Sequence, residues 1–177
     1  KGAKHSVRTR IYYVDNQNTN GQANQSTLYY GQYQYQKKFQ KYKDLVLTSG
    51  ITGNYSESNS ALYRGNAGAS PLNFSGNYAF FMQLDKKFWD RVTVSAGGRY
   101  ETFSINKSDN ESAPVFRAGV SSRIFKETYA RASFGEGFRA PTIAEKYIRT
   151  SVGPMAIYPN EDVLSEKSWN AEFGIKQ

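Results

Sequence analysis

The stretch FGEGFRAPTIAEKYIRTSVGPMAIYPNEDVLSEKSWNAEFGIKQ, residues 134–177, joins the end of one alternating segment to the start of another through a long irregular loop. Pro141 fixes its own φ and disfavours helical geometry at Ala140. A strand that runs through Ala132 and Phe134 can therefore leave its ladder here, and residues 138–142 are predicted to be a strand exit. A generic Gly/Pro loop with an incidental arginine would give the same local pattern.

Outside this loop, about eight segments alternate apolar and polar residues with a period of two, and no helix of useful length is apparent. They lie near residues 5–14, 27–37, 44–55, 74–84, 92–101, 116–124, 130–135 and 168–176. In the clearest one, Val92 and Val94 share a face opposite Thr93 and Ser95. The pattern predicts an all-β, antiparallel, up-and-down meander.

The expected connections alternate in length. Long ones cover residues 15–26, 56–73, 106–113 and the loop of the opening stretch, and short ones lie at 39–43, 86–91 and 125–128. Long loops on one side and tight turns on the other are typical of outer-membrane barrels. Aromatic residues bracket every short turn and would suit a membrane interface on the periplasmic side: Phe39, Tyr42, Phe88, Trp89, Phe125 and Tyr129.

The alternation alone does not say which face meets lipid, because a soluble β-sandwich gives the same pattern. Most segments approach the roughly 9 to 11 residues that a tilted strand needs to cross a bilayer, which favours a membrane barrel. Mean hydropathy is −0.69 and aromatic residues make up 15% of the chain. No apolar run approaches the roughly 18 residues of a membrane helix, so any span must consist of strands.

The net charge of +8 raises the question of nucleic acid as a partner. The cations do not form one stripe, and many of them crowd two of the short turns, so no nucleic-acid partner is predicted. Those in the turns are Lys37, Lys38, Lys41, Lys43, Lys86, Lys87 and Arg91. The chain has no cysteine, which excludes disulfides and thiolate metal sites.

No constellation of catalytic residues emerges, so neither enzyme activity, a cofactor nor a metal site is predicted. His5 is the only histidine, and the carboxylates Asp85, Glu101 and Glu172 lie on polar strand faces with no partner carboxylate indicated. The glycine-rich pieces 96–98 and 135–138 lack a following helix, so they are not phosphate cradles. Such glycines more often mark bulges or close packing beside aromatic rings.

Ligand binding at the external loops is the remaining possibility. Their Tyr, Arg, Asn and Ser residues could stack on a ligand and donate hydrogen bonds to it, although ordinary solvated loops have the same composition. The candidate ligand contacts are Tyr63, Arg64, Tyr147, Arg149 and Tyr158. The two arginines among them are the candidates for anionic groups.

The long loop and its flanks resemble a signature of TonB-dependent outer-membrane receptors. The matching residues are Phe138, Arg139, Ala140, Pro141, Thr142, Asn160, Asp162, Glu166, Lys167 and Ser168. The family's loop typically carries prolines where this chain has Glu161 and Ser165. Upstream of residue 129 the resemblance rests on strand rhythm and on pieces such as VTVSAGGRYE.

The resemblance implies a barrel of about 22 strands closed around an N-terminal plug. Residues 1–177 would then be part of the barrel of a longer protein, without its plug. The implied function is uptake of a scarce, bulky nutrient, most often a ferric siderophore, energised by TonB at the bacterial outer membrane. Haem is disfavoured, because no histidine lies between Pro141 and Asn160, while cobalamin, another metal chelate or an oligosaccharide stays open.

Two other functions are compatible with the pattern. Eight strands can close into a small barrel filled by side chains, which would act as an adhesin or envelope anchor. An outer-membrane hydrolase would need a nucleophile and a base near the rim, and His5 would have to be that base.

Overall fold

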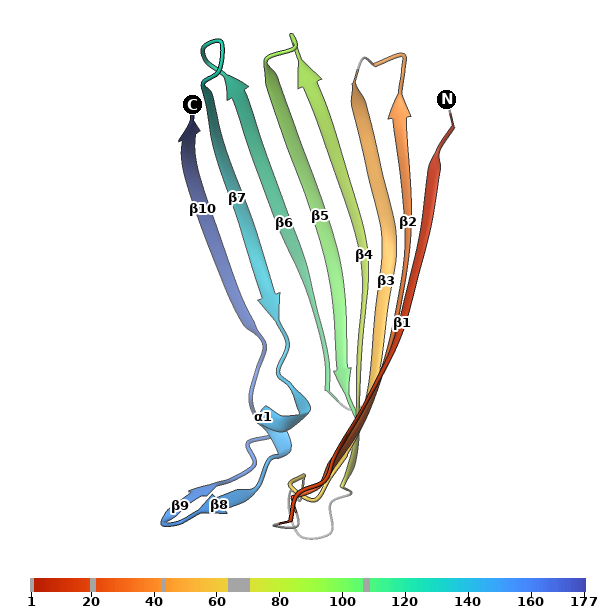
Figure 1. Cartoon of the computed structure of the whole chain (residues 1–177), viewed down its shortest axis with the longest axis vertical. Helices are drawn as coiled ribbons and strands as arrows, with labels where there is room; N and C mark the ends of the chain where they lie inside the picture. The colour runs from red at the N-terminus through yellow and green to blue at the C-terminus, as the bar shows by residue number, and fades with distance from the viewer. Residues whose placement is uncertain (1, 20–21, 43, 64–70, 107–108) are drawn as a thin grey trace.

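The computed structural model of the chain describes residues 2–19, 22–42, 44–63, 71–106 and 109–177. Eight long strands form one antiparallel sheet in which every strand pairs with its neighbours in sequence order, as expected (Figure 1). They are β1 (Lys4–Asn16), β2 (Asn24–Phe39), β3 (Leu45–Ser60), β4 (Leu72–Phe88), β5 (Val92–Ile105), β6 (Asp109–Arg123), β7 (Tyr129–Arg139) and β10 (Glu166–Lys176). Among the described residues β1 and β10 are the edge strands, so these eight strands do not close on themselves.

The connection between β7 and β10 holds the remaining elements, the helix α1 (Ile143–Tyr147) and the two-stranded hairpin of β8 (Thr150–Val152) and β9 (Met155–Ile157). β7 ends at Arg139, which confirms the predicted strand exit before Pro141. Sequence periodicity did not reveal α1, because five residues are too few to display a helical repeat.

The strands are longer than the alternation indicated, and one expected loop was wrong. β3 continues to Ser60 and β2 begins at Asn24, and residues 109–113 belong to β6 instead of a loop. The polar strand ends lack apolar alternation, yet their backbones still pair, as at Thr102↔Ser112, where the two hydroxyls lie 3.1 Å apart. The connection between β5 and β6 is therefore confined to residues 106–108.

Asn106 shows how β5 ends. Its φ is 50°, in the left-handed region that asparagine tolerates better than most residues. Its backbone N–H donates to the carbonyl of Phe74 at 2.9 Å, and its Oδ1 accepts from the N–H of Phe74 at 2.9 Å. The side chain thus continues the hydrogen bonding to β4 after the backbone has turned away.

The apolar residues of the alternating strands are exposed on one face of the sheet. Phe116 is 56% exposed, Trp169 72% and Phe173 74%, and the rings of Phe134 and Trp169 stack across β7 and β10 with centroids 6.4 Å apart. They do not converge on a sealed interior, as a soluble sandwich would require. The buried hydrophobic residues lie elsewhere, mainly towards the long-loop end: Ala79, Phe103, Ile105, Ala113 and Ile143.

Strand glycines make room for bulky neighbours, as predicted for residues 96–98. A Cβ added to Gly98 would lie 3.3 Å from the ring of Phe116. Gly50 has the same relation to Phe81, whose Cζ lies 2.7 Å from the position of such a Cβ. Close packing of backbone against an aromatic ring therefore occurs on both faces of the sheet.

Among the described residues no helix is long and apolar enough to cross a membrane.

Candidate functional site

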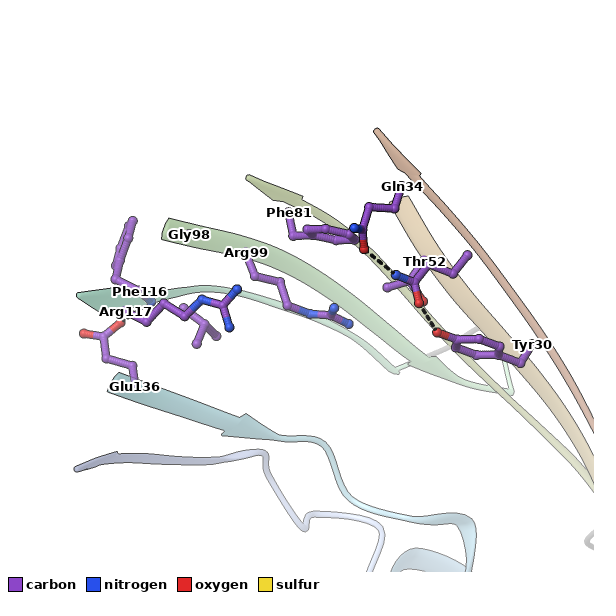
Figure 2. Close-up of a pocket in the computed structure, with 11 residues that line it drawn as sticks. Tyr30, Gln34, Thr52, Phe81, Gly98, Arg99, Phe116, Arg117 and Glu136 are labelled. Atoms are coloured by element: carbon purple, nitrogen blue, oxygen red, sulfur yellow. Dashed lines mark hydrogen bonds between the residues drawn. The ribbon is translucent and has the colours of Figure 1, made fainter. Parts of the chain in front are cut away.

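A polar cavity of about 350 Å³ lies against the polar face of the sheet, opposite the face with the exposed apolar side chains (Figure 2). Six strands, β2 to β7, supply its lining. Most of the lining residues share the polar face, because neighbouring antiparallel strands bring paired residues to the same side, whereas Gly98, Phe116 and Glu136 border the cavity from the alternate positions. It is lined by Tyr30, Gln32, Gln34, Thr52, Phe81, Gly98, Arg99, Val115, Phe116, Arg117 and Glu136. The sheet curves around this side, and Figure 2 shows the side chains of Arg99 and Arg117 extending into the space within the curve.

A row of hydrogen-bonded side chains follows β2 along this cavity. The hydroxyl of Tyr30 donates to Oε1 of Gln32 at 2.6 Å, and Nε2 of Gln32 donates to Oε1 of Gln34 at 3.4 Å. The residues are two apart in sequence, so the strand places them on one face. The repeat of glutamine in this strand thus becomes a ladder of amide groups.

The charged residues that line the cavity are held by neighbours on the sheet. Arg99 forms a salt bridge with Glu101, and Arg117 donates to Oε1 of Gln83. Glu136 accepts a hydrogen bond from the backbone N–H of Phe116 at 2.9 Å. These charges are fixed in place, so the wall presents oriented polar groups to whatever occupies the curve.

Glu101 and Asp85, two of the carboxylates predicted to lie on polar strand faces, contact different partners. Glu101 pairs with Arg99, while Asp85 accepts hydrogen bonds from Gln83 at 2.8 Å and from Ser95 at 2.5 Å. Nδ1 of His5 lies 2.7 Å from the hydroxyl of Tyr33. Within the described ranges, no group of three or more His, Asp or Glu side chains is arranged to hold a metal ion.

The signature loop is anchored at the end of the sheet where the long connections lie. Thr142 caps α1 by accepting from the N–H of Glu145 at 3.2 Å, while the carboxylate of Glu145 accepts from the N–H of Thr142 at 2.8 Å. This reciprocal pair is a capping box. The backbone N–H of Thr142 lowers the pKa of Glu145, with further lowering from the Thr142 hydroxyl and Arg139 against partial burial.

A small hydrophobic core ties the loop to the sheet. Ile143 packs with Phe103 and Ile105 of β5, and Tyr63, Ala140 and Tyr147 pack against this cluster. One backbone hydrogen bond, from Arg149 N–H to the carbonyl of Leu62 at 2.8 Å, links the loop to the β3–β4 connection, and another within the loop runs from Asn160 N–H to the carbonyl of Lys146 at 3.0 Å. The loop is therefore fixed to the β3–β4 connection and to β5.

The predicted ligand contacts fall into two groups. Tyr63 and Tyr147 are half-buried against the loop core, whereas Arg149 lies over the exposed ring of Tyr158, with Cζ 5.9 Å from its centroid. Arg64 lies outside the described residues. Strand alternation puts Gln32, Gln34, Arg99 and Arg117 on polar faces but does not predict a joint site, because parity does not indicate which residues lie at the same height.

The exposed apolar face has hollows of its own. One of about 590 Å³ is lined by residues that include Val7, Ile51, Tyr78 and Phe80, and Gly31 and Gly53 leave room for it. An added Cβ at Gly31 would meet nothing within 4 Å. Such shallow apolar hollows on an outward face fit acyl chains of lipid better than a polar ligand.

The comparisons with known proteins agree with this arrangement. The chain is similar to the crystal structure of the siderophore receptor PirA from Pseudomonas aeruginosa, with a TM-score of 0.76 and 16% sequence identity. The similarity covers 98% of this chain and 36% of that one, so the chain spans about a third of that receptor's length. No curated protein matches the chain. The TonB dependent receptor-like, beta-barrel model matches residues 2–177, and the chain therefore belongs to that family as a segment of its up-and-down barrel.

Proposed function

We propose that the chain forms part of the barrel wall of a bacterial outer-membrane receptor that takes up a scarce, bulky nutrient with energy from TonB. One observation carries the proposal: a sheet with exposed apolar side chains on one face and a fixed polar network within its curve. A transmembrane barrel needs that inverted distribution, since lipid surrounds it and water fills it. The family membership supports the same conclusion.

A ferric siderophore is the proposed cargo. The similar solved structure is titled a siderophore receptor, and the loops combine an exposed arginine with an exposed tyrosine at Arg149 and Tyr158. An Arg guanidinium binds oxyanions and its face stacks on aromatic rings, both useful for an anionic chelate. Tyr63 and Tyr147 would support the rim from the loop core, and Arg64 stays a proposed contact.

In this scheme the plug and the segment that contacts TonB belong to other parts of the full-length protein. The polar wall around Arg99 and Arg117 would line the inside of the barrel. Its partners would be outer-membrane lipid, TonB and the ligand, with no nucleic acid and no catalytic step.

Uptake assays in a deletion strain test the proposal. Under iron limitation, the gene should restore uptake of radiolabelled iron from siderophores of the host's environment, and only when TonB is present. Labelled cobalamin and oligosaccharides serve as alternative cargoes. Restored uptake of one of these alone would replace the cargo, and TonB-independent rescue would remove the transport mechanism.

The exposed pair of Arg149 and Tyr158 and the half-buried pair of Tyr63 and Tyr147 should affect uptake differently. Arg149→Ala and Tyr158→Ala should weaken binding with little effect on folding, because both side chains are exposed. Tyr63→Phe is the matched control, since it keeps the ring in the loop core. Equal uptake by all three variants and the wild type would exclude the Arg149 and Tyr158 contact.

A further inference from the structure

A second cavity, of about 300 Å³, lies at the end of the sheet where the short turns are. It is lined by Arg91 from the β4–β5 turn and by Arg123, Ile124, Phe125 and Lys126 at the β6–β7 turn. The two turns adjoin because β5 pairs with β6. All five lining residues are exposed, so the cavity is open to its surroundings.

Two arginines face each other at this cavity. The β5–β6 ladder ends with Val92↔Ser122, and the next residues outward are Arg91 and Arg123, joined by a hydrogen bond from Arg123 N–H to the Arg91 carbonyl at 2.9 Å. Like charges directly opposite each other destabilise a sheet. An anion bound between them would remove that repulsion.

The nearby carboxylates do not neutralise these cations. At the short-turn end Asp44 pairs with Lys38 at 2.5 Å and Asp90 with Lys87 at 3.1 Å. Within the described part of the chain Arg91, Arg123 and Lys126 form no salt bridge, although Glu127 follows Lys126 in the turn. Three positive charges therefore border one cavity, and no carboxylate among the described residues forms a salt bridge with them.

Apolar side chains lie beside the cations. Ile124 is 50% exposed and Phe125 72% exposed within the cavity lining, and Trp89 in the adjoining turn is 85% exposed. Exposed aromatic rings next to arginine and lysine are characteristic of the level at which acyl chains meet headgroups. A free anion would match the charges of the cavity but not its apolar members.

We propose that this cavity binds the phosphate diester of an anionic phospholipid, with Arg91, Arg123 and Lys126 around the phosphate and Ile124 and Phe125 against the start of the acyl chains. Arginine binds phosphate oxygens through paired N–H groups. The inference rests on the proposed function, because it places this end of the sheet at a membrane surface. Bound lipid would hold the two adjacent turns together and fix the depth at which the barrel sits in the membrane.

The test uses the full-length protein in neutral nanodiscs of phosphatidylcholine, with phosphatidylglycerol titrated in and bound lipid counted by native mass spectrometry. Arg91→Gln combined with Arg123→Gln should weaken phosphatidylglycerol binding about 30-fold, at about 1 kcal/mol for each cation near an anionic surface. The control pair Lys37→Gln and Lys41→Gln removes the same charge from the end of β2 and the β2–β3 turn, outside the cavity lining, and should leave binding within about threefold. Lys126→Gln alone should weaken binding about fivefold.

Other results would overturn the inference. These are equal loss in the control pair, equal binding of phosphatidylcholine, or binding of inorganic phosphate or an acidic peptide as tightly as of the lipid. Failure of the wild-type protein to insert into nanodiscs would sink the proposed function as well. Insertion without preference for the anionic lipid would remove the lipid site alone.

Discussion

Arg139 at the end of β7 and Glu166 at the start of β10 are direct cross-strand partners, with Arg139 Nε 3.3 Å from Glu166 Oε2. The same guanidinium forms a two-pronged contact with Glu145, Nη1 to Oε2 at 3.0 Å and Nη2 to Oε1 at 2.5 Å. Two residues at opposite ends of the signature loop therefore meet, together with the cap of α1, around one arginine. This geometry gives a physical reason for finding both residue types in the signature.

We expect Arg139→Ala to lower the stability of the full-length protein more than Glu166→Ala, because only the arginine joins both carboxylates. These side chains are about half exposed or more, apart from Glu145 at 39%, so each ion pair should contribute about 0.2 to 1 kcal/mol. A double-mutant cycle read by urea unfolding in micelles measures the coupling. Additive single effects would mean that the contacts contribute nothing measurable.

The stability of the capped α1 loop should depend on pH. Since folding holds the pKa of Glu145 below its ordinary value of 4.5, the ionised carboxylate stabilises the folded loop. This contribution is complete above pH 4.5 and disappears as the pH falls through the lower folded pKa. Hydrogen exchange at the Thr142 amide from pH 6 to pH 3 measures the loss, and Glu145→Gln should abolish the pH dependence.

The two faces of the sheet should respond oppositely to arginine. Phe173→Arg places a charge on the exposed apolar face near the middle of β10 and should cost about 2 to 4 kcal/mol. Val94→Arg lies close to the β4–β5 turn, so its cost should be smaller, about 1 kcal/mol.

Asn170→Arg and Ser95→Arg on the opposite face are the matched controls and should be tolerated. Unfolding in micelles compares the four variants. If all four were equally stable, the assignment of the lipid-facing side would be wrong.

Gly50 should be intolerant of even a methyl group. A Cβ there would press on the backbone carbonyl of Tyr33 and lie 2.7 Å from Cζ of Phe81, so Gly50→Ala should lose about 1 to 3 kcal/mol. Gly31→Ala in the neighbouring strand is the control, because nothing lies within 4 Å of its added Cβ. Chemical unfolding of both variants gives the comparison, and a neutral Gly50→Ala would show that Phe81 moves aside freely.

Local signals in the sequence determined the strands and turns. The alternation around Val92 and Val94 assigns a face residue by residue, and Pro141 sets the end of β7, because both effects act over one or two residues. Strand ends at Asn24 and Ser60 escaped detection, since backbone pairing persists where side chains lose their alternation. The short α1 escaped for lack of a full helical repeat.

Only the tertiary structure decided which residues meet. Tyr63 and Tyr147, distant in sequence, share one small core with Ile143, while Arg149 and Tyr158 stay exposed together. Likewise Arg91 and Arg123 become opposed only through the register of β5 and β6. Register and loop packing depend on contacts summed over whole strands, so no single stretch of sequence contains them.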